Sequence, residues 1–485
     1  MLRRTKIVAT LGPATDDPKV LDEVIAAGVD VVRLNMSHGT YEDHEQRADW
    51  VRNRARASGR QVGVLVDLQG PKIRVAKFAD GKINLAVGDK FIIDSDWDIN
   101  GGNQERVGTT YQTLHEECSR GDTLLLNDGH IVLWVEEVVG KEVHCKTVIG
   151  GVLSNNKGIN KQGGGLSAPA LTEKDKEDIK FAAKIEADYV AVSFVREAED
   201  CHLTRRLLAE AGNEHAGIVS KIERAEALDC IEEIVDASDV IMVARGDLGV
   251  EIGDAELPAV QKRLIKTARQ MNCVVITATQ MMESMIHSPI PTRAEVFDVA
   301  NAVLDGTDAV MLSAESAAGD YPAKAVEAMD RVCREAEKQS QSRQSDHRLH
   351  SVFGRIDEAI AMSTMYTANH LGVAAIAALT ESGSTTKWMS RISSGIPIYA
   401  LTSQVATRRK VTMYRGVYPV SFGLESGIDS RHANTEIIEE LQRRGAVRDD
   451  DLVIITKGDL NGVAGGTNVM KIIRVGEHKV LPGDQ

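Results

Sequence analysis

The sequence has little of what marks nucleic-acid-binding, disulfide-rich or membrane proteins. Aromatic residues make up only 4% of the 485 residues, which argues against platforms that stack on single-stranded nucleic acid. The six cysteines are scattered without a CxxC pair, so we expect reduced core thiols. No apolar run approaches the ~18 residues of a membrane span. The apolar run near the N-terminus is too short for a signal peptide and soon meets Asp16 and Asp17, so we expect a cytoplasmic protein.

Positive charge is also in short supply. The chain has 57 Lys and Arg residues against 71 Asp and Glu residues, which gives a net charge of −14 at pH 7. A chain this acidic is a poor general binder of nucleic acid, although a local basic site can still hold an anionic substrate. Hydrophobic residues make up 43% of the chain, which is ordinary for a globular protein with large cores. The length suggests about two to four domains.

Eight short apolar runs recur along the chain, and each ends on a residue that can take part in chemistry. They lie at residues 5–10, 29–37, 62–67, 188–193, 217–223, 239–247, 273–279 and 308–315. Continuous β-branched runs of this length are typical of strands buried on both faces of a parallel sheet, and helical patterns lie between most of them. The pattern predicts an α/β fold, a (β/α)₈ TIM barrel with its active site at the C-terminal ends of the strands.

The alternation of strand and helix patterns stops after the third run. From about residue 71 to residue 170, short alternating runs are separated by Gly, Asn and Asp, which predicts an all-β lid domain inserted after the third strand. The end of this insertion, residues 155–165, is rich in Gly and Asn and is expected to be flexible. A helical pattern begins again after Thr172, which is predicted to be a helix N-cap.

A polar, glycine-free stretch lies at residues 339–349, and we interpret it as a linker or a helix end. A second series of helix and strand patterns follows it. Helices and strands alternate from residue 355 to residue 475, and this predicts a separate C-terminal doubly wound α/β domain. The sequence therefore predicts a barrel, a lid and a C-terminal regulatory domain. Their ranges are residues 1–70 with 171–344, residues 71–170, and residues 345–485, in that order.

Two acidic residues end neighbouring strands of the predicted barrel. Lys221 and Glu223 stand two residues apart, so their side chains share a face, and Asp247 follows the next strand after Arg245 and Gly246. Carboxylates on adjacent strands suit a hard divalent cation such as Mg²⁺ or Mn²⁺. A rim of salt bridges, with Lys221 paired to Glu223 and Arg245 to Asp247, is the alternative.

Three polar residues share a face at the end of the second strand. Arg33 offers a planar fork for a phosphate or a carboxylate. Asn35 and Ser37 offer neutral oxygens for a cation, or donors for a phosphate. Taken alone, these residues would be interpreted as a capped strand-to-helix turn.

The third and seventh strands bring further polar residues to the same rim. Lys72 and Arg74 open the insertion and would place two positive charges over the mouth of the barrel. A hinge at residues 70–71 would let the insertion close and exclude water. The hydroxyls of Thr277 and Thr279 could touch a substrate or relay a proton through water.

The combination of charges at one rim favours a substrate site over a salt-bridged rim or a capped turn. It fits a metal ion with a phosphorylated, carboxylated substrate, and it favours phosphoryl transfer by positioning and electrostatics. The cations are Arg33, Lys72, Arg74 and Lys221, and the carboxylates are Asp67, Glu223 and Asp247.

Several longer strings in this order resemble the pyruvate kinases, and the match runs essentially from end to end. The strings are TKIVATLGPAT, VVRLNMSHG, DLQGPKIR, VSKIE, VIMVARGDLGVE, TATQMMESM and SAESAAGDYP. The resemblance implies transfer of the phosphoryl group of phosphoenolpyruvate to ADP, which gives pyruvate and ATP in the final step of glycolysis. It also implies a homotetramer that is regulated through its C-terminal domain.

The resemblance assigns roles to the residues at matching positions. Lys221 would stabilise the phosphoryl group in flight, and Glu223 and Asp247 would bind Mg²⁺, with Mn²⁺ as an alternative. The catalytic set is Lys221, Arg33 and Thr279, and the substrate-binding set is Arg33, Gly246, Asp247 and Thr279. The nucleotide-facing set is Asn35, Ser37, His38, Arg74 and Lys161.

Two positions depart from the members that require K⁺. Those members usually have threonine and glutamate where this chain has Leu68 and Lys72. A tethered ammonium can replace a bound monovalent cation, so we expect that activity does not require K⁺. In place of K⁺ ligation, the expected partners of Lys72 and Arg33 are Asn35, Ser37 and Asp67.

A phosphate-binding loop is expected where the first strand of the C-terminal domain meets its helix. Small hydroxyls and backbone N–H groups at such a turn suit a phosphate, and the residues are Thr380, Ser382, Gly383, Ser384 and Thr385. The late loop at residues 457–466 lacks the Trp- and Arg-containing pattern of members activated by fructose-1,6-bisphosphate. The expected activator is therefore a sugar monophosphate or AMP, and an ordinary turn is the alternative.

Two other functions would fit parts of this pattern. A Mg²⁺-dependent aldolase or lyase acting on pyruvate enolates also uses carboxylates on adjacent strands, but it needs no nucleotide-facing cations. A non-catalytic metabolite sensor would have little need for Lys221, Glu223 and Asp247 together. The expected partners are phosphoenolpyruvate, ADP, ATP and pyruvate, with no nucleic acid and no membrane.

Overall fold

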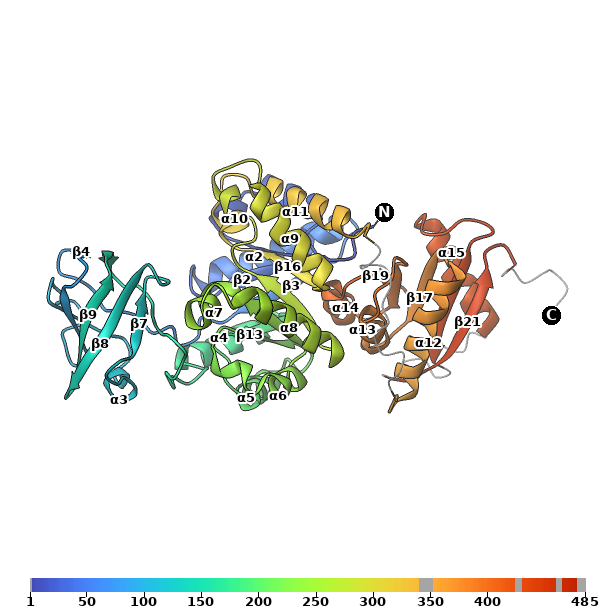
Figure 1. Cartoon of the computed structure of the whole chain (residues 1–485). Coiled ribbons are helices and arrows are strands. Elements are labelled where there is room, and N and C mark those ends of the chain that lie inside the picture. Colours follow the sequence, from blue (N-terminus) through green and yellow to red (C-terminus); the bar gives the residue numbers. More distant parts are fainter. Residues whose placement is uncertain (1, 340–351, 424–429, 459–464, 478–485) are drawn as a thin grey trace.

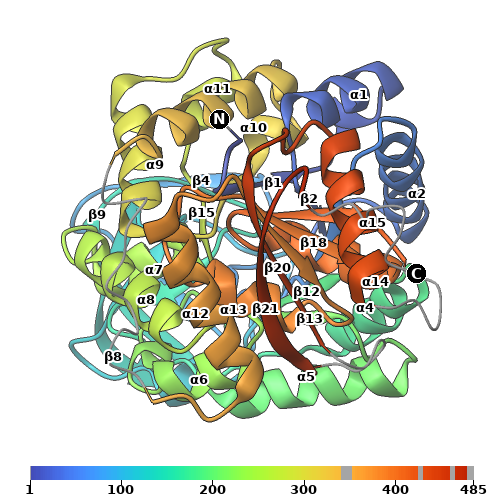
Figure 2. The same ribbon diagram turned by 90° about the vertical axis from the view of Figure 1, so that its right-hand side faces the viewer.

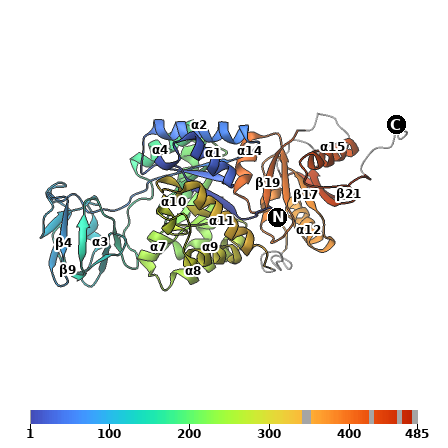
Figure 3. The same ribbon diagram turned by 90° about the horizontal axis from the view of Figure 1, so that it is seen from above.

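The fold has three parts arranged in a row. The computed structural model describes residues 2–339, 352–423, 430–458 and 465–477. A closed barrel occupies the middle, a β-rich insertion lies at one end and an α/β sheet lies at the other (Figures 1 and 3). The predicted boundary at residues 344–345, and all but the first residue of the predicted linker, lie outside the described residues.

Eight parallel strands close into the barrel, which confirms the predicted fold class. In chain order they are β1 (Lys6–Thr10), β2 (Val31–Asn35), β3 (Gly63–Asp67), β12 (Tyr189–Val192), β13 (Gly217–Ile222), β14 (Val240–Ala244), β15 (Val274–Ala278) and β16 (Ala309–Leu312). Around the barrel the order is β1-β16-β15-β14-β13-β12-β3-β2. Every residue of β1, β3, β14 and β15 is buried, because the barrel interior covers one face and the helices cover the other.

Helices follow the barrel strands and form the outer layer. The α-helices are α1 (Pro18–Ala27), α2 (Tyr41–Ala57), α4 (Glu173–Lys184), α5 (Ala198–Glu210), α6 (Ile231–Ala237), α7 (Arg245–Ile252), α8 (Leu257–Gln270), α9 (Arg293–Asp305), α10 (Ala314–Ala317) and α11 (Pro322–Ala336). Short 3₁₀ turns lie at Pro13–Thr15, Glu226–Leu228 and Glu283–Ile286. The helix α4 begins as predicted, because Thr172 and Asp175 form a reciprocal capping box.

The insertion between β3 and α4 is built from strands and one short helix. They are β4 (Lys82–Leu85), β5 (Lys90–Asp94), β6 (Arg106–Gly108), α3 (Leu114–Glu117), β7 (Thr123–Leu126), β8 (Ile131–Val139), β9 (Glu142–Ile149), β10 (Gly151–Ser154) and β11 (Ile159–Lys161). Six of the strands form one sheet in the order β11-β7-β8-β9-β5-β6, and β10 pairs with β4. The Gly- and Asn-rich segment at residues 155–165, expected to be flexible, thus contains a strand, because β11 pairs antiparallel with β7.

The C-terminal part is a five-stranded sheet with helices. Its elements are α12 (Ile356–Leu371), β17 (Ala375–Leu379), α13 (Ser384–Ser390), β18 (Ile398–Thr402), α14 (Val405–Lys410), a 3₁₀ turn (Val411–Met413), β19 (Val417–Ser421), α15 (Ser430–Arg443), β20 (Leu452–Gly458) and β21 (Thr467–Arg474). The strand order is β19-β18-β17-β20-β21, and only β21 runs antiparallel to its neighbour. Figure 2 looks onto this part, with the barrel behind it.

The C-terminal part docks on the end of the barrel where the strands begin. The Lys6 ammonium at the start of β1 donates to the Val417 carbonyl oxygen at 2.6 Å, and the Arg409 guanidinium lies 2.8 Å from an oxygen of Asp188. The opposite end, where the strands finish, faces the insertion (Figure 1). None of the described helices has both the length and the apolar character that a membrane span requires.

Candidate active site

A buried ammonium lies at the centre of the C-terminal rim of the barrel. The Nζ atom of Lys221 in β13 lies 2.7 Å from Ser193 Oγ, 3.0 Å from Glu223 Oε1 and 3.4 Å from Asp67 Oδ1. Its side chain is 12% exposed, against 1% for Asp67. Burial alone would lower the pKa of Lys221, but the charges of Asp67 and Glu223 raise it. The residue is therefore a fixed positive charge at neutral pH.

Arg33 joins this network through the same aspartate. Its Nε atom donates to Asp67 Oδ2 at 2.6 Å, and its Nη1 atom donates to Thr10 Oγ1 at 3.0 Å. Burial alone would raise the pKa of Asp67, but the charges of Lys221 and Arg33 hold it below its usual value. Asp67 therefore stays ionised and fixes two cations side by side at the mouth of the barrel, a combination that suits a doubly charged anion such as a phosphate.

Two carboxylates stand beside this pair of cations, as predicted from β13 and β14. Glu223 follows β13 and is 2% exposed, and its Oε2 atom accepts a hydrogen bond of 2.8 Å from the Phe194 backbone N–H. Asp247 lies in the first turn of α7, which follows β14 directly. Burial and the neighbouring charge of Asp247 raise the pKa of Glu223, while Lys221 acts in the opposite direction.

The donor set around these carboxylates fits a hard divalent cation. Among the described residues, no group of three or more His, Cys, Asp or Glu side chains is placed to hold a metal ion. One or two carboxylates with positions left for water and substrate oxygens is the usual arrangement for Mg²⁺. The mutual repulsion of Glu223 and Asp247 is what a divalent charge between them would relieve.

The loop after β15 holds a strained hydroxyl against α7. Thr279 and Gln280 have φ values of +64° and +55°, which is unusual for residues other than glycine and costs energy for a β-branched one. The Thr279 Oγ1 atom accepts a hydrogen bond of 2.9 Å from the Gly246 N–H and donates to the Ala278 carbonyl oxygen at 2.7 Å. A donor from α7 and a hydroxyl from the loop after β15 therefore meet at one point of the rim.

Arg245 holds this loop in its strained conformation. Its Nε atom donates to the Ala278 carbonyl oxygen at 3.1 Å, and its Nη2 atom donates to the Thr279 carbonyl oxygen at 2.5 Å. Its Nη1 atom is paired at 2.6 Å with Asp298 in α9. Arg245 is thus not the partner of Asp247, and the alternative of a simple salt-bridged rim is wrong for this pair, while the Lys221–Glu223 ion pair does form.

Lys72 reaches the rim from the insertion. Its Nζ atom lies 3.1 Å from Asp247 Oδ1 and 3.7 Å from Asp128 Oδ1. Burial alone would lower the pKa of Lys72, but Asp247 and Asp128 raise it. Asp67 is the residue expected to orient both Lys72 and Arg33. It pairs with Arg33 as expected, but its second partner is Lys221 and not Lys72.

The residues expected to face a nucleotide are spread over the rim and the insertion. Asn35 ends β2, and its Oδ1 atom accepts from the Ser37 backbone N–H at 3.1 Å, while Ser37 and His38 are exposed. Arg74 is held by the Asn156 carbonyl oxygen at 2.8 Å. Lys161 lies in the six-stranded sheet.

Lys161 is engaged within that sheet. Its Nζ atom is 2.9 Å from Asp122 Oδ2 and 2.8 Å from the Glu117 carbonyl oxygen. These contacts tie the ammonium to neighbours in the insertion, and they account for its low exposure of 17%.

Four contributors to the network received no role from the sequence. Ser193 ends a predicted strand, so its position at the rim could have been found, but nothing marked it as the closest partner of Lys221. Thr10 likewise ends a predicted strand, the one at residues 5–10. The Phe194 backbone N–H and Asp128 act through distant parts of the chain, and no local pattern signals such contacts. The contact of Asp128 with Lys72 spans 56 residues, 72 to 128.

The fold and the rim together define a class of enzyme. A TIM barrel with a β-rich insertion, two neighbouring carboxylates and fixed positive charges at its rim is suited to metal-assisted chemistry on a phosphorylated anion. The sequence matches two family models, "Pyruvate kinase, barrel domain" over residues 2–326 and "Pyruvate kinase, alpha/beta domain" over residues 358–473. The chain belongs to the pyruvate kinase family.

Curated relatives agree over nearly the whole length. A protein of Salmonella typhimurium named "Pyruvate kinase II" is 56% identical over 478 residues, which cover 98% of this chain and 99% of the relative. A "Pyruvate kinase" of Haemophilus influenzae is 54% identical over 478 residues, with the same coverage. A "Pyruvate kinase" of Mycobacterium intracellulare is 42% identical over 484 residues, which cover 99% and 100%. Family membership implies a phosphotransferase that uses a divalent metal ion and handles phosphoenolpyruvate, pyruvate, ADP and ATP.

Proposed function

We propose that the chain transfers the phosphoryl group of phosphoenolpyruvate to ADP at the barrel rim, as the final step of glycolysis. The single observation that supports this site best is the network of Lys221, Arg33 and Asp67, in which one ionised carboxylate fixes two cations side by side. In the reaction the bond between the phosphorus and the enol oxygen breaks, and a bond to the terminal phosphate oxygen of ADP forms. The enolate left behind takes up a proton and becomes pyruvate.

Each cation has a distinct task in this proposal. Arg33 binds the phosphate of phosphoenolpyruvate through its planar guanidinium. Lys221 lies opposite the negative charge that spreads over the phosphoryl oxygens in the transition state, and it is already oriented by Ser193. Because both cations are held by buried partners, little reorganisation is needed when the phosphoryl group moves.

The other end of the substrate is held by α7 and the strained loop. The Gly246 N–H and the Thr279 hydroxyl meet at 2.9 Å and are both suited to the substrate carboxylate. We also assign to Thr279 the task of passing a proton through a water molecule to the enolate carbon. Asp247 completes this side through the cation site.

Glu223 and Asp247 are the residues we assign to Mg²⁺, with Mn²⁺ as an alternative of the same chemistry. When bound, the ion neutralises charge on the phosphoryl oxygens and orients them. Asn35, Ser37, His38, Arg74 and Lys161 are the proposed nucleotide-facing residues. Lys161 would have to leave Asp122 to reach a nucleotide, which fits a lid that moves when it closes.

The products formed test this function directly. The enzyme supplied with phosphoenolpyruvate, ADP and Mg²⁺ should form one ATP for each pyruvate, and omission of ADP should stop pyruvate formation. A Mg²⁺-dependent lyase would form pyruvate without ADP. Equal pyruvate formation with and without ADP would therefore refute the phosphotransferase proposal.

We further propose that Lys72 takes the place of a K⁺ ion. Its ammonium lies at the rim, 3.1 Å from Asp247, and it is a permanent positive charge next to the cation site. The substitution Lys72→Glu should create a requirement for K⁺, seen as at least about a tenfold rate increase on adding KCl at constant ionic strength. The control is Lys82→Glu, in an exposed position of β4, which should leave the rate indifferent to K⁺.

We propose that the chain has three domains: a barrel at residues 1–70 and 171–344, a lid at residues 71–170 and a regulatory domain at residues 345–485. In the regulatory domain we propose an effector phosphate site at residues 380–385. Gly383 has a φ of +82° before α13 and donates its N–H to Thr380 Oγ1 at 2.9 Å. Ser382 and Ser384 are accessible, and Glu381 and Ser382 line a cavity of about 860 Å³. The Thr385 hydroxyl, by contrast, is bonded to Thr467. Most of the late loop at 457–466 lies outside the described residues.

Charge replacement tests the effector site. The double variant Ser382→Asp with Ser384→Asp should lose activation by a sugar monophosphate or AMP and keep its basal rate, because two carboxylates repel a phosphate. Ser119→Asp, at an exposed position of the insertion, is the control. Activation that is unchanged in the double variant would rule out this site. The proposed homotetramer is tested separately by the mass of the enzyme in solution.

A further inference from the structure

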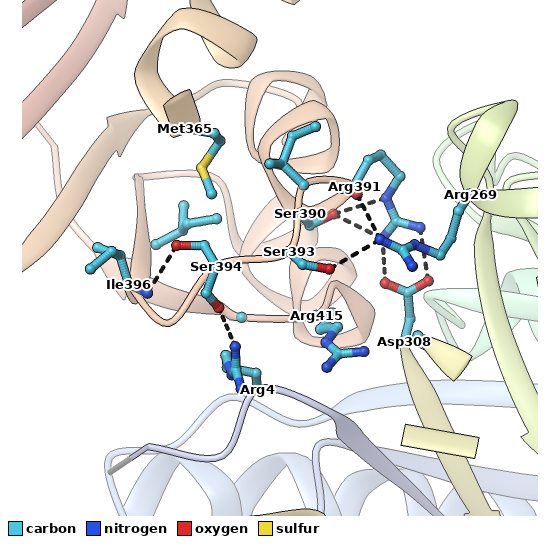
Figure 4. Close-up of a pocket in the computed structure, with 14 residues that line it drawn as sticks. Arg4, Arg269, Asp308, Met365, Ser390, Arg391, Ser393, Ser394, Ile396 and Arg415 are labelled. Atoms are coloured by element: carbon cyan, nitrogen blue, oxygen red, sulfur yellow. Dashed lines mark hydrogen bonds and ion pairs between the residues drawn. The ribbon is translucent and has the colours of Figure 1, made fainter. Parts of the chain in front are cut away.

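Four arginines converge on a small enclosed space between the barrel and the C-terminal part (Figure 4). Arg4 and Arg269 come from the barrel, and Arg391 and Arg415 come from the C-terminal part. The space has a volume of about 20 Å³, which is room for one water-sized particle. It lies at the end of the barrel where the strands begin, so it is separate from the catalytic rim.

Two of the four positive charges are already balanced. Arg391 is 1% exposed and makes a bidentate ion pair with Asp308, with one contact of 2.8 Å from Nη1 to Oδ2. Arg4 lies 3.5 Å from Glu337 Oε2, and the same carboxylate accepts from the Arg4 backbone N–H at 2.9 Å. Both carboxylates are fully buried and committed to these partners.

The other two guanidiniums lack a counter-charge. Within the described ranges, neither Arg269 nor Arg415 has a carboxylate at ion-pair distance, and the Arg415 Nη2 atom has no hydrogen-bond partner. Arg415 is 9% exposed and is held by its Nη1 atom, which donates to the Thr307 carbonyl oxygen at 3.1 Å. Burial and the charges of Arg415 and Arg391 lower the pKa of Arg269 to about 10, so it is still charged at neutral pH.

Buried charge without compensation is strongly unfavourable. An arginine cannot discharge itself at neutral pH, and a guanidinium out of water needs an anion or acceptors for its N–H groups. A water molecule would satisfy one N–H group but would leave two positive charges unbalanced. A tetrahedral oxyanion such as phosphate is too large for a space that admits one water-sized particle.

We propose that this space binds a single monatomic anion of the halide type, which is chloride in ordinary salt. The anion would accept hydrogen bonds from the Arg415 Nη2 group and its neighbours, and it would balance one of the two uncompensated positive charges between the two parts of the molecule. Because two of the arginines come from each side, its binding would stabilise the docking of the C-terminal part on the barrel.

Crystals grown with sodium bromide in place of sodium chloride test the site on the unmodified enzyme. Bromide scatters X-rays anomalously, so an anomalous peak in the space lined by Arg415, Arg269 and Ser393 would support the proposal. An ordered water with no anomalous signal, or bromide found only at exposed surface positions, would overturn it.

Thermal unfolding in solution gives an independent test. The unfolding midpoint of the unmodified enzyme should rise by about 2 °C in sodium chloride relative to sodium gluconate at equal ionic strength, because a ligand that binds only the folded state stabilises it. The variant Arg415→Gln should lose this chloride-specific shift. Arg206→Gln, at an exposed surface ion pair with Glu199, should retain it. An equal shift in the Arg415→Gln variant would contradict the proposal.

Discussion

At the scale of single residues, the rim works because each charge is held by a partner that is itself buried. Asp67 lies between Arg33 and Lys221, and its low pKa keeps it an acceptor for both. Removing one member would leave the others buried without compensation, which is more costly than the loss of one hydrogen bond. The sequence predicted the charged members from their places at strand ends, but it could not predict the hydroxyl of Ser193 as the closest contact of Lys221.

Removal of the central charge tests the role of Lys221. The variant Lys221→Gln keeps a polar side chain but loses the positive charge, so kcat should fall by about 10²–10³. Steady-state kinetics with phosphoenolpyruvate and ADP measure this. The matched control is Lys180→Gln, which breaks an exposed ion pair with Glu177 and should leave kcat unchanged. A decrease of less than tenfold for Lys221→Gln would show that another group carries the charge.

Asp298 offers a test of the strained loop without touching the substrate side. The variant Asp298→Asn removes the counter-charge of Arg245, so the loop at Thr279 should relax. We expect a rise in KM for phosphoenolpyruvate and a decrease in kcat of about tenfold, because a small displacement of a positioned group lowers the rate strongly. Asp305→Asn, in the same helix and paired with Lys262, controls for a general effect on α9. Kinetics identical to those of this control would argue against a positioning role.

At the scale of elements, strand-to-helix junctions bring the proposed functional groups to the rim. The strand β14 passes directly into α7, so that Arg245, Gly246 and Asp247 form the first turn of the helix. This junction was predictable in outline, because an apolar strand pattern runs straight into polar residues. The strand β11 was not, because its three residues are short and surrounded by glycines, and only the pairing with β7 makes it a strand.

The far end of α7 is linked to the insertion by a carboxyl group with an unusual pKa. Burial, with a contribution from Glu226, raises the pKa of Glu251 from 4.5 to about 7. Its Oε1 atom accepts from Asn160 in β11 at 3.4 Å, and its Oε2 atom accepts from the Ala225 N–H at 2.8 Å. The folded enzyme therefore holds this proton at a pH where the unfolded chain has released it.

The pH dependence of stability should show this proton. Because the folded-state pKa is raised, Glu251 lowers the free energy of unfolding as pH rises from about 4.5 to 7, by at most about 3 kcal/mol. In the variant Glu251→Gln the side chain at this position cannot ionise. The unfolding midpoint of the variant should therefore exceed that of the unmodified enzyme, and this difference should grow between pH 5 and pH 8. Glu210→Gln, at an exposed position, should run parallel to the unmodified enzyme. A constant difference for Glu251→Gln would refute this account.

At the scale of the whole molecule, the barrel separates chemistry from docking. Its C-terminal rim carries the proposed active site and faces the insertion, while its other end carries the C-terminal part (Figure 1). The three parts follow from changes in sequence rhythm, and this is why the fold could be predicted. The contacts that join the three parts could not be predicted. Asp308 and Arg391, for example, are 83 residues apart, and in the local sequence each is an ordinary polar residue beside an apolar run.

The most direct test of the central claim is pyruvate formation from phosphoenolpyruvate with Mg²⁺, measured with and without ADP in a buffer whose only monovalent cation is Na⁺, and again after addition of K⁺. We predict ADP-dependent turnover at similar rates in both buffers, because we assign the chemistry to Lys221 and Arg33 and the monovalent charge to Lys72. Turnover that appears only with K⁺ would contradict the role of Lys72. The absence of ADP-dependent turnover in both buffers, with sugar monophosphates and AMP present, would contradict the central claim itself.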